Sequence, residues 1–304
     1  MKYLARLFYS VSIVLFISCN SQNDSKNGVP STFKIGIFGG ENPAETKTRT
    51  KLFQQYLEKE LGVKVEFIYT TDYTTIIEAL HRKKIQAAHI SPFSYVIASR
   101  KTELVPLVTI GLNHQPTTFH SIIITNAASP IKSIEDLKLH ARDLSIAFAD
   151  PASTSGHLIP RAFLNSIGLD VDSFKAKVFA GNHAGVILSV QSGKVDIGGT
   201  NNELSFQRLV EDGVVKQADF RILWTSSPLV NDLVIIRKDI DTAFINKYKQ
   251  ALLDADKKDF AAFSGSIYRF YPHPENMQYI AVEDSAYNEL RRIAAGIKDL
   301  NFSK

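Results

Sequence analysis

The chain has 304 residues, enough for one large domain or for two lobes with a substantial core. Hydrophobic residues make up 44% of the sequence and charged residues 22%, as in ordinary soluble globular proteins. The formal net charge is only +4 and no long basic run is present, so the composition argues against a nucleic-acid partner.

The N-terminus has the pattern of a secretory signal. Lys2 and Arg6 give it a positive start, an apolar run follows, and the small Ser18 precedes Cys19. The apolar run is too short to span a bilayer as a helix. Cys19 is the only cysteine, so no disulfide can form within the chain. We therefore expect residues 1–18 to be a removable signal peptide.

The lone cysteine at the end of this signal resembles the bacterial lipoprotein processing box. That resemblance implies that Cys19 is acylated and becomes the new N-terminus, anchored to a bacterial membrane on its periplasmic or cell-surface side. Residues 19–32 are polar and would form a flexible tether. The alternative is an ordinary signal peptide cut nearby.

Beyond the tether, apolar runs with strand character alternate with segments whose apolar residues recur at helical spacing. The predicted strands are residues 33–38, 63–69, 85–90, 104–110, 119–125, 144–149, 177–181, 195–200, 221–225 and 231–237. The predicted helices are residues 46–60, 73–84, a helix opened by Pro92, a short one near 133–136, 158–167, 183–192, 202–210, 242–255, 259–263 and 284–300. The alternation predicts an α/β protein with mainly parallel sheets flanked by helices.

The middle of the chain holds its own set of alternating units, so we predict two lobes. Residues 119–225 form lobe 2, inserted into a lobe 1 made of residues 33–118 and 226–304. Two hinge crossings then connect the lobes. A ligand cleft is expected between them, at loops leaving the carboxyl ends of strands.

A stretch rich in small hydroxyl residues lies between a predicted strand and a predicted helix. Ser153, Thr154 and Ser155 are followed by Gly156. The first turn of a helix has backbone N–H groups without partners and partial positive charge, so hydroxyl donors there favour an anion site. The alternative is that Ser153 or Thr154 merely caps the helix.

Three further segments offer donors where a helix follows a strand. Tyr73 follows the capping residue Asp72, Tyr95 lies in the segment opened by Pro92, and His183 follows a Gly-Asn pair. Hydrogen-bond donors at several helix starts would suit a phosphorus oxyanion.

In order and spacing these segments resemble the substrate-binding component of phosphonate, phosphite and phosphate ABC importers. The resemblance covers about residues 33–262, and its segments are 73–80, 91–95, 150–157, 181–183 and 193–198. It implies a two-lobe, type II periplasmic binding protein fold that closes over its ligand. It also implies an ABC permease and its ATPase as partners, with the membrane reached through the N-terminal lipid, and a monomer.

The resemblance also implies the ligand-binding residues. They would be Tyr73, Tyr95, Ser153, Thr154, Ser155, His183 and Asn201, with Gly156, His157 and Glu203 as secondary candidates. The sequence departs from the family pattern at Asn201, where many members have an acid, and at Ala184, where many have Asp. An uncharged amide weakens the case for an ammonium on the ligand. We therefore expect phosphate, phosphite or a small phosphonate without an amine.

Three other functions remain open. Ser153 with His157 or His183 and Asp150 could form a hydrolase set, but the nucleophile-elbow pattern is absent, and we expect no enzyme activity and no cofactor. A metal site is disfavoured because the histidines are scattered. A sensor lipoprotein of the same fold, for another small anion such as a sulfonate, is the main alternative.

Overall fold

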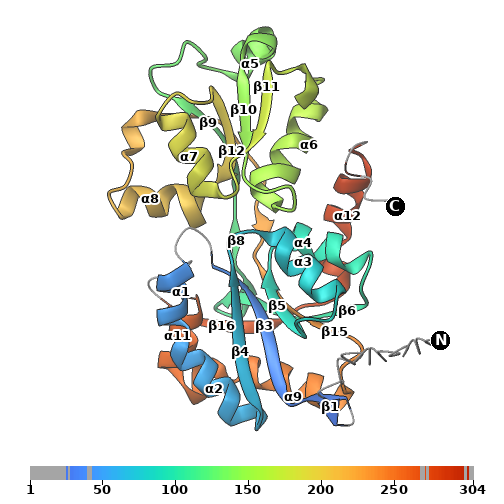
Figure 1. Cartoon of the computed structure of the whole chain (residues 1–304). Helices are drawn as coiled ribbons and strands as arrows, with labels where there is room; N and C mark the ends of the chain where they lie inside the picture. The colour runs from blue at the N-terminus through green and yellow to red at the C-terminus, as the bar shows by residue number, and fades with distance from the viewer. Residues whose placement is uncertain are drawn as a thin grey trace, which may run out of the picture.

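A computed structural model of the chain describes residues 25–26, 28–39, 43–267, 271, 274–297 and 300. It shows two lobes, one above the other in Figure 1, each built on a β-sheet with helices against both faces. The predicted signal peptide and Cys19 lie outside the described residues. Within those residues, no helix has the length and apolar character that crossing a membrane requires.

Lobe 1 contains a mixed sheet with the strand order β16-β6-β15-β5-β3-β4. Its strands are β3 (Thr32–Phe38), β4 (Lys64–Thr70), β5 (Ala87–Ile90), β6 (Leu104–Leu112), β15 (Leu233–Arg237) and β16 (Met277–Ala281), with β7 (Gln115–Pro116) beside β6. β3 runs parallel to β4 and β5, whereas β15, β6 and β16 pair antiparallel.

Two groups of helices cover this sheet, because each strand turns alternate apolar side chains to opposite faces. One group comprises α1 (Pro43–Arg49), α2 (Lys51–Leu61), α9 (Thr242–Leu253), α10 (Ala255–Lys258) and α11 (Phe260–Ile267). The other comprises α3 (Tyr73–His81), α4 (Pro92–Ser99) and α12 (Asn288–Ala295). Phe33 and Ile35 of β3 face the first group, whereas Phe38 packs with the second.

Lobe 2 contains a five-stranded sheet with the order β11-β10-β12-β9-β13. Its strands are β9 (Ser121–Asn126), β10 (Ser145–Phe148), β11 (Ala176–Phe179), β12 (Ile197–Asn201) and β13 (Phe220–Thr225). Its helices are α5 (Ile134–His140), α6 (Ile159–Ser166), α7 (His183–Gln191) and α8 (Arg208–Glu211). π-helical turns at Thr154–Leu158 and Asn202–Gln207 lead into α6 and α8.

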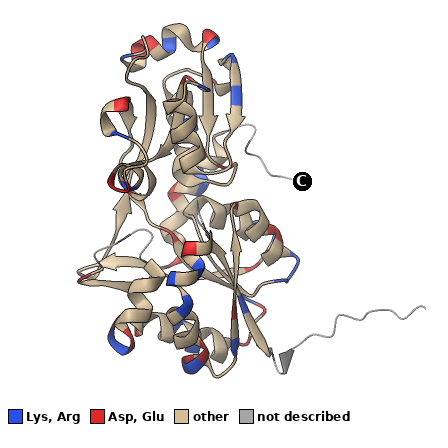
Figure 2. Cartoon of the chain, turned by 60° about the vertical axis from the view of Figure 1, so that its left-hand side comes forward, with Lys and Arg blue, Asp and Glu red and all other residues tan. Residues whose placement is uncertain are grey.

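The short elements complete the described chain. They are the hairpin of β1 (Ser25–Lys26) and β2 (Val29–Pro30) and the 3₁₀ turns Ala141–Asp143, Val171–Ser173, Gln217–Asp219 and Asp284–Tyr287. The positions of acidic and basic residues are interspersed over both lobes in Figure 2, in keeping with the small net charge.

The two crossings between the lobes run side by side. β8 (Thr118–Phe119) pairs antiparallel with β14 (Leu229–Val230), and Figure 1 shows β8 between the two sheets. α12 contacts both α4 of lobe 1 and α6 of lobe 2. Ala152 and Leu158 of lobe 2 are buried in the apolar cluster of α3 and α4. The lobes therefore touch beside the two crossings.

The structure corrects several sequence-based element predictions. The sheets are mixed rather than mainly parallel, because the strands next to each crossing return antiparallel. No strand was predicted between the helices expected at residues 259–263 and 284–300, but β16 lies there and pairs antiparallel with β6. The single helix predicted over residues 46–60 is two helices that meet at Thr50. The helix predicted to reach residue 84 ends at His81, since Lys83 has a φ of 57°.

Gly198 of β12 allows α7 to pack tightly on the sheet. A Cβ at Gly198 would lie 2.5 Å from Val186 Cγ1 and 2.9 Å from Val190 Cγ2. We expect Gly198→Ala to lower the free energy of unfolding by about 1–3 kcal/mol, because overpacking forces side chains from their rotamers. Urea denaturation would measure the change. Gly296→Ala, where the nearest such contact is 3.4 Å, should stay within about 0.5 kcal/mol of wild type. Equal losses in both variants would contradict this packing account.

Candidate functional site

A small cavity lies between the lobes and is lined by residues from both. Lobe 1 contributes Phe38, Tyr73, Ser91 and Asp232, the first crossing contributes Phe119, and lobe 2 contributes Ser153, Thr154, Ser155, His183, Asn201, Leu204 and Ser205. The space that the centre of a water-sized sphere can reach is about 20 Å³, close to the room that one water needs. The sequence therefore predicts most of the polar residues that the fold gathers here.

The hydroxyl triplet follows β10 and is fully buried. Ser153 Oγ accepts a hydrogen bond from Gly156 N at 3.1 Å, as an N-cap does, so the capping alternative holds for this one hydroxyl. Gly156 does not line the cavity. A Cβ there would lie 2.5 Å from Ala149 Cβ and 2.8 Å from His183 Cε1. Gly156 thus lets the triplet pack against His183.

His183 connects the triplet to β12. It is the first residue of α7, and the side chain of Asn182 caps that helix by accepting from Gly185 N at 2.8 Å. Its Nδ1 lies 3.1 Å from Thr200 Oγ1, and its Nε2 lies 3.4 Å from Ser153 Oγ. One ring nitrogen therefore faces the hydroxyl residues, and the other is held by the sheet.

The start of α3 meets lobe 2 through a buried carboxylate. Asp150 accepts hydrogen bonds from the backbone N–H groups of Ala152, at 2.7 Å, and of Tyr73 across the cleft. Burial raises the pKa of the Asp150 carboxyl, and those two donors oppose the rise. The ring of Tyr73 stacks on Phe38 with centroids 4.1 Å apart.

The start of α4 meets the same loop of lobe 2. The backbone N–H of Phe93 donates to Thr154 Oγ1 at 2.9 Å, and Ser94 Oγ donates to the carbonyl of Ala152 at 2.9 Å. Because the Thr154 oxygen accepts in this contact, its hydroxyl proton is left to donate elsewhere. The loop that carries the triplet thus also joins the lobes.

Two acceptors complete the cavity. Asn201, at the end of β12, is 4% exposed, and its Oδ1 has no hydrogen-bond partner within the described parts of the chain. Asp232 is 7% exposed and was missed by the sequence analysis. It comes directly after the second crossing, just before β15, and that position is the signal that could have found it. A ligand here meets acceptors as well as donors.

Tyr95 was predicted as a donor to the ligand, but it lies away from the cavity. Its hydroxyl donates to the carboxylate of Asp284, and the Arg291 guanidinium lies 5.7 Å from its ring centroid. Burial raises the pKa of Tyr95, and Asp284 raises it further. The Tyr95 side chain lies on the side of α4 that faces the C-terminal segment, so the structure gives it a packing role.

The secondary candidates Glu203 and His157 also lie outside the cavity lining. Glu203 accepts from the backbone N–H of His120 at 2.8 Å and contacts His120 Nδ1 at 2.6 Å, beside the first crossing. His157 Nδ1 is bonded to the carbonyl of Pro151 at 2.8 Å, and its ring packs between Phe148 and Phe179. Both side chains are committed to contacts within the protein.

The arrangement can bind a small anion, and it shows no metal centre. In the part of the chain that the structure describes, no three His, Cys, Asp or Glu side chains come close enough to hold a metal ion. The hydroxyls, the imidazole and the phenol can donate hydrogen bonds, and they are gathered at helix starts, where backbone dipoles favour negative charge.

Comparisons with known proteins point the same way. The family described as "ABC transporter, phosphonate, periplasmic substrate-binding protein" matches residues 35–286. The phosphonates-binding periplasmic protein of Escherichia coli (strain K12) is 30% identical over 208 residues, which are 68% of this chain and 61% of that protein. This chain thus spans less than two thirds of that relative's length. The phosphate-import protein PhnD of Mycolicibacterium smegmatis is 26% identical over 79% of this chain and 77% of its own.

A solved structure shows the same fold. PhnD1 from Prochlorococcus marinus (MIT 9301), in complex with methylphosphonate, superimposes with a TM-score of 0.75 at 22% identity, covering 87% of this chain and 97% of that one. At this level of identity the likeness establishes the two-lobe architecture.

Burial lowers the pKa of His157 to about 4, whereas an unfolded histidine titrates near 6.5. Between these values the unfolded chain binds more protons than the folded one, so stability falls as the pH drops through this window. We expect wild type to lose about 2–3 kcal/mol more than His157→Gln between pH 7 and pH 4.5. Urea denaturation at each pH would measure this. Equal losses of stability in the two proteins would contradict the lowered pKa of His157.

Proposed function

The chain belongs to the family of periplasmic substrate-binding proteins of phosphonate ABC transporters, and we propose that it binds a phosphorus oxyanion between its lobes and delivers it to a membrane permease. The observation that carries this proposal is the convergence of Ser153, Thr154, Ser155, Tyr73 and His183 on one buried cavity. No described residue that lines this cavity is Lys or Arg, so hydroxyls, the His183 imidazole and helix starts would hold the anion.

Two acceptors in the lining bear on the protonation state of the proposed ligand. Asn201 Oδ1 is buried without a partner in the described residues, and Asp232 is an acid in the same lining. A buried acceptor that stays unpaired costs about 1–3 kcal/mol, so a ligand with its own donor is favoured. A singly protonated phosphorus oxyanion offers a P–OH group. A sulfonate is fully ionised at neutral pH and has no proton to donate.

Asp232 also affects the expectation about an amine. The uncharged Asn201 disfavours an ammonium on the ligand, but Asp232 supplies a carboxylate in the same cavity. We retain phosphate, phosphite and a small phosphonate as the proposed ligands. An aminoalkyl phosphonate becomes the informative competitor, because its ammonium would pair with Asp232.

Ligand binding would act on the equilibrium between open and closed forms. The cavity takes its donors from both lobes, so a bound oxyanion bridges them and favours closure. The loop contacts with α3 and α4 hold the lobes in the same closed arrangement. The permease would then recognise the closed form.

Membrane attachment completes the proposal. Acylated Cys19 would hold the protein, as a monomer, beside the permease and its ATPase, and residues 19–32 would serve as the tether. One acyl chain anchors only marginally, so the multiply acylated terminus of a lipoprotein is needed. A sensor that presents the same ligand to a membrane receptor is the second candidate, and neighbouring genes for a permease and an ATPase would favour import.

Calorimetry on the soluble form that begins after Cys19 would test the ligand class. We expect phosphate, phosphite or methylphosphonate to bind with one site per chain, and methanesulfonate to bind at least about tenfold more weakly because it offers no proton to Asn201 Oδ1. Tight binding of 2-aminoethylphosphonate alone would contradict the proposed ligand. Methanesulfonate binding as tightly as methylphosphonate would contradict the choice of phosphorus.

A pair of substitutions would separate the cavity from the rest of the cleft. Thr154→Val removes a buried hydroxyl that contacts Phe93 N and lines the cavity, so affinity should fall by about 1–3 kcal/mol. Tyr95→Phe removes only the hydrogen bond to Asp284, so affinity should be unchanged while stability falls by about 1 kcal/mol. The reverse ranking of affinities would place the ligand elsewhere.

A further inference from the structure

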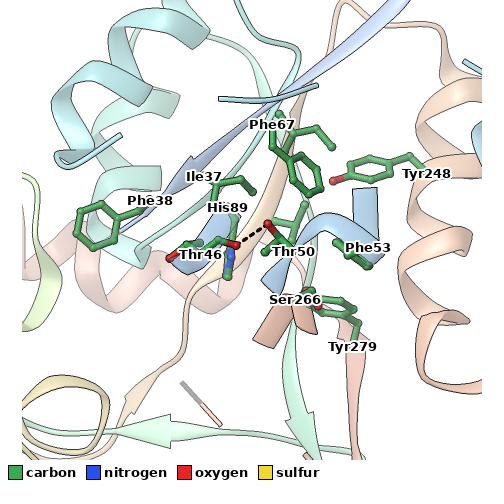
Figure 3. Close-up of a pocket in the computed structure, with 12 residues that line it drawn as sticks. Ile37, Phe38, Thr46, Thr50, Phe53, Phe67, His89, Tyr248, Ser266 and Tyr279 are labelled. Carbon is green, nitrogen blue, oxygen red and sulfur yellow. Dashed lines mark hydrogen bonds between the residues drawn. The ribbon is translucent and has the colours of Figure 1, made fainter. Parts of the chain in front are cut away.

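A second cavity lies in lobe 1, on the face of the sheet that α2, α9 and α11 cover. It is lined by Ile35, Ile37, Phe38, Thr46, Thr50, Phe53, Phe67, His89, Val234, Tyr248, Ser266 and Tyr279. The space open to the centre of a water-sized sphere is about 40 Å³, twice that of the cavity between the lobes. Figure 3 shows these side chains around the hollow.

The chemistry of this second cavity suits a hydrocarbon group. Thr50 Oγ1 donates to the carbonyl of Thr46 at 2.7 Å, and Ser266 Oγ donates to the carbonyl of Phe263 at 2.6 Å. With these hydroxyls already engaged, most of the remaining lining is aromatic and aliphatic. Apolar walls gain free energy from an apolar occupant and offer little to an oxyanion.

Phe38 connects the two cavities. It is the one residue that the described linings of both have in common. It is also the last residue of β3, so beyond it the strand no longer separates the two faces of the sheet. Figure 3 shows its ring turned away from the other residues of the lobe 1 cavity, and that ring stacks on Tyr73 at an interplanar angle of 20°.

We propose that Phe38 is a specificity-determining residue that limits the carbon substituent of the ligand by separating the oxyanion cavity from the lobe 1 cavity. This inference rests on the proposed function. A phosphonate held by the hydroxyl triplet and Tyr73 would meet the Phe38–Tyr73 stack with its substituent. A methyl group would need the least room beside the stack. A longer chain needs the apolar space that lies past the end of β3.

A homologous series tests the size limit by calorimetry, with methyl-, ethyl-, butyl- and phenylphosphonate as probes. Wild type should bind butylphosphonate at least tenfold more weakly than methylphosphonate. Phe38→Ala should reduce that difference at least tenfold, because the substituent can then enter the lobe 1 cavity. Phe38→Leu keeps an apolar contact with Tyr73, so its difference between the two affinities should lie between those of wild type and Phe38→Ala. It replaces the alanine variant in the test if that variant folds poorly.

A second substitution shows where the substituent goes. Ser266→Leu fills the lobe 1 cavity from α11 and should leave methylphosphonate affinity unchanged in an otherwise wild-type chain. Combined with Phe38→Ala, it should abolish the gain for butylphosphonate. Loss of the Tyr73 stack alone would weaken all four ligands by the same factor and leave their ratios unchanged.

The outcomes separate this inference from the proposed function. If wild type binds methylphosphonate but its ratio to butylphosphonate is unchanged by Phe38→Ala, the size limit is overturned and the proposed function stands. The size limit is also overturned if adding Ser266→Leu to Phe38→Ala does not remove the gain in butylphosphonate affinity. If wild type binds none of the phosphonates, phosphate or phosphite, the proposed function fails and the inference fails with it.

Discussion

The loop after β10 both holds the two lobes together and lines the cavity between them. The first turns of α3 and α4 have N–H groups without partners in their own helices. Asp150 accepts from Tyr73 N and Thr154 accepts from Phe93 N, so lobe 2 satisfies donors of lobe 1 across the cleft. The same loop carries the hydroxyls that line the cavity. The contacts that join the lobes and the hydroxyls that line the cavity therefore come from the same loop.

The composition of the cavity lining has an electrostatic consequence. A cavity built from hydroxyls, an imidazole and helix starts can hold an anion without a buried Lys or Arg, whose desolvation would be costly. Asn201 and Asp232 add acceptors to the same small space. The hydrogen-bond donors would then favour a negatively charged ligand, and the acceptors would favour a ligand that keeps one proton. If the proposed function is right, such a mixture would discriminate among tetrahedral anions by protonation state, because a buried acceptor such as Asn201 Oδ1 that stays unpaired lowers affinity.

The local parts of the site could be predicted from the sequence. Hydroxyl residues between a strand and a helix indicate the triplet, and the same logic places Tyr73 and His183 at helix starts. Tyr95 lies outside the cavity lining, and its hydroxyl is bonded to Asp284, a contact 189 residues along the chain that local sequence does not reveal. Asp232 was not predicted, because a single acidic residue after a crossing forms no sequence motif with its neighbours. β16 is missed because its stability comes from pairing with β6.

The most direct test of this account is a crystal structure of the protein grown with methylphosphonate. The account predicts the phosphorus atom between the lobes, with its oxygens within hydrogen-bond distance of Ser153, Thr154, Ser155, Tyr73 and His183. Phosphorus bound anywhere outside that cavity, or a ligand-free cleft at saturating methylphosphonate in crystals whose cleft is open to solvent, would contradict it.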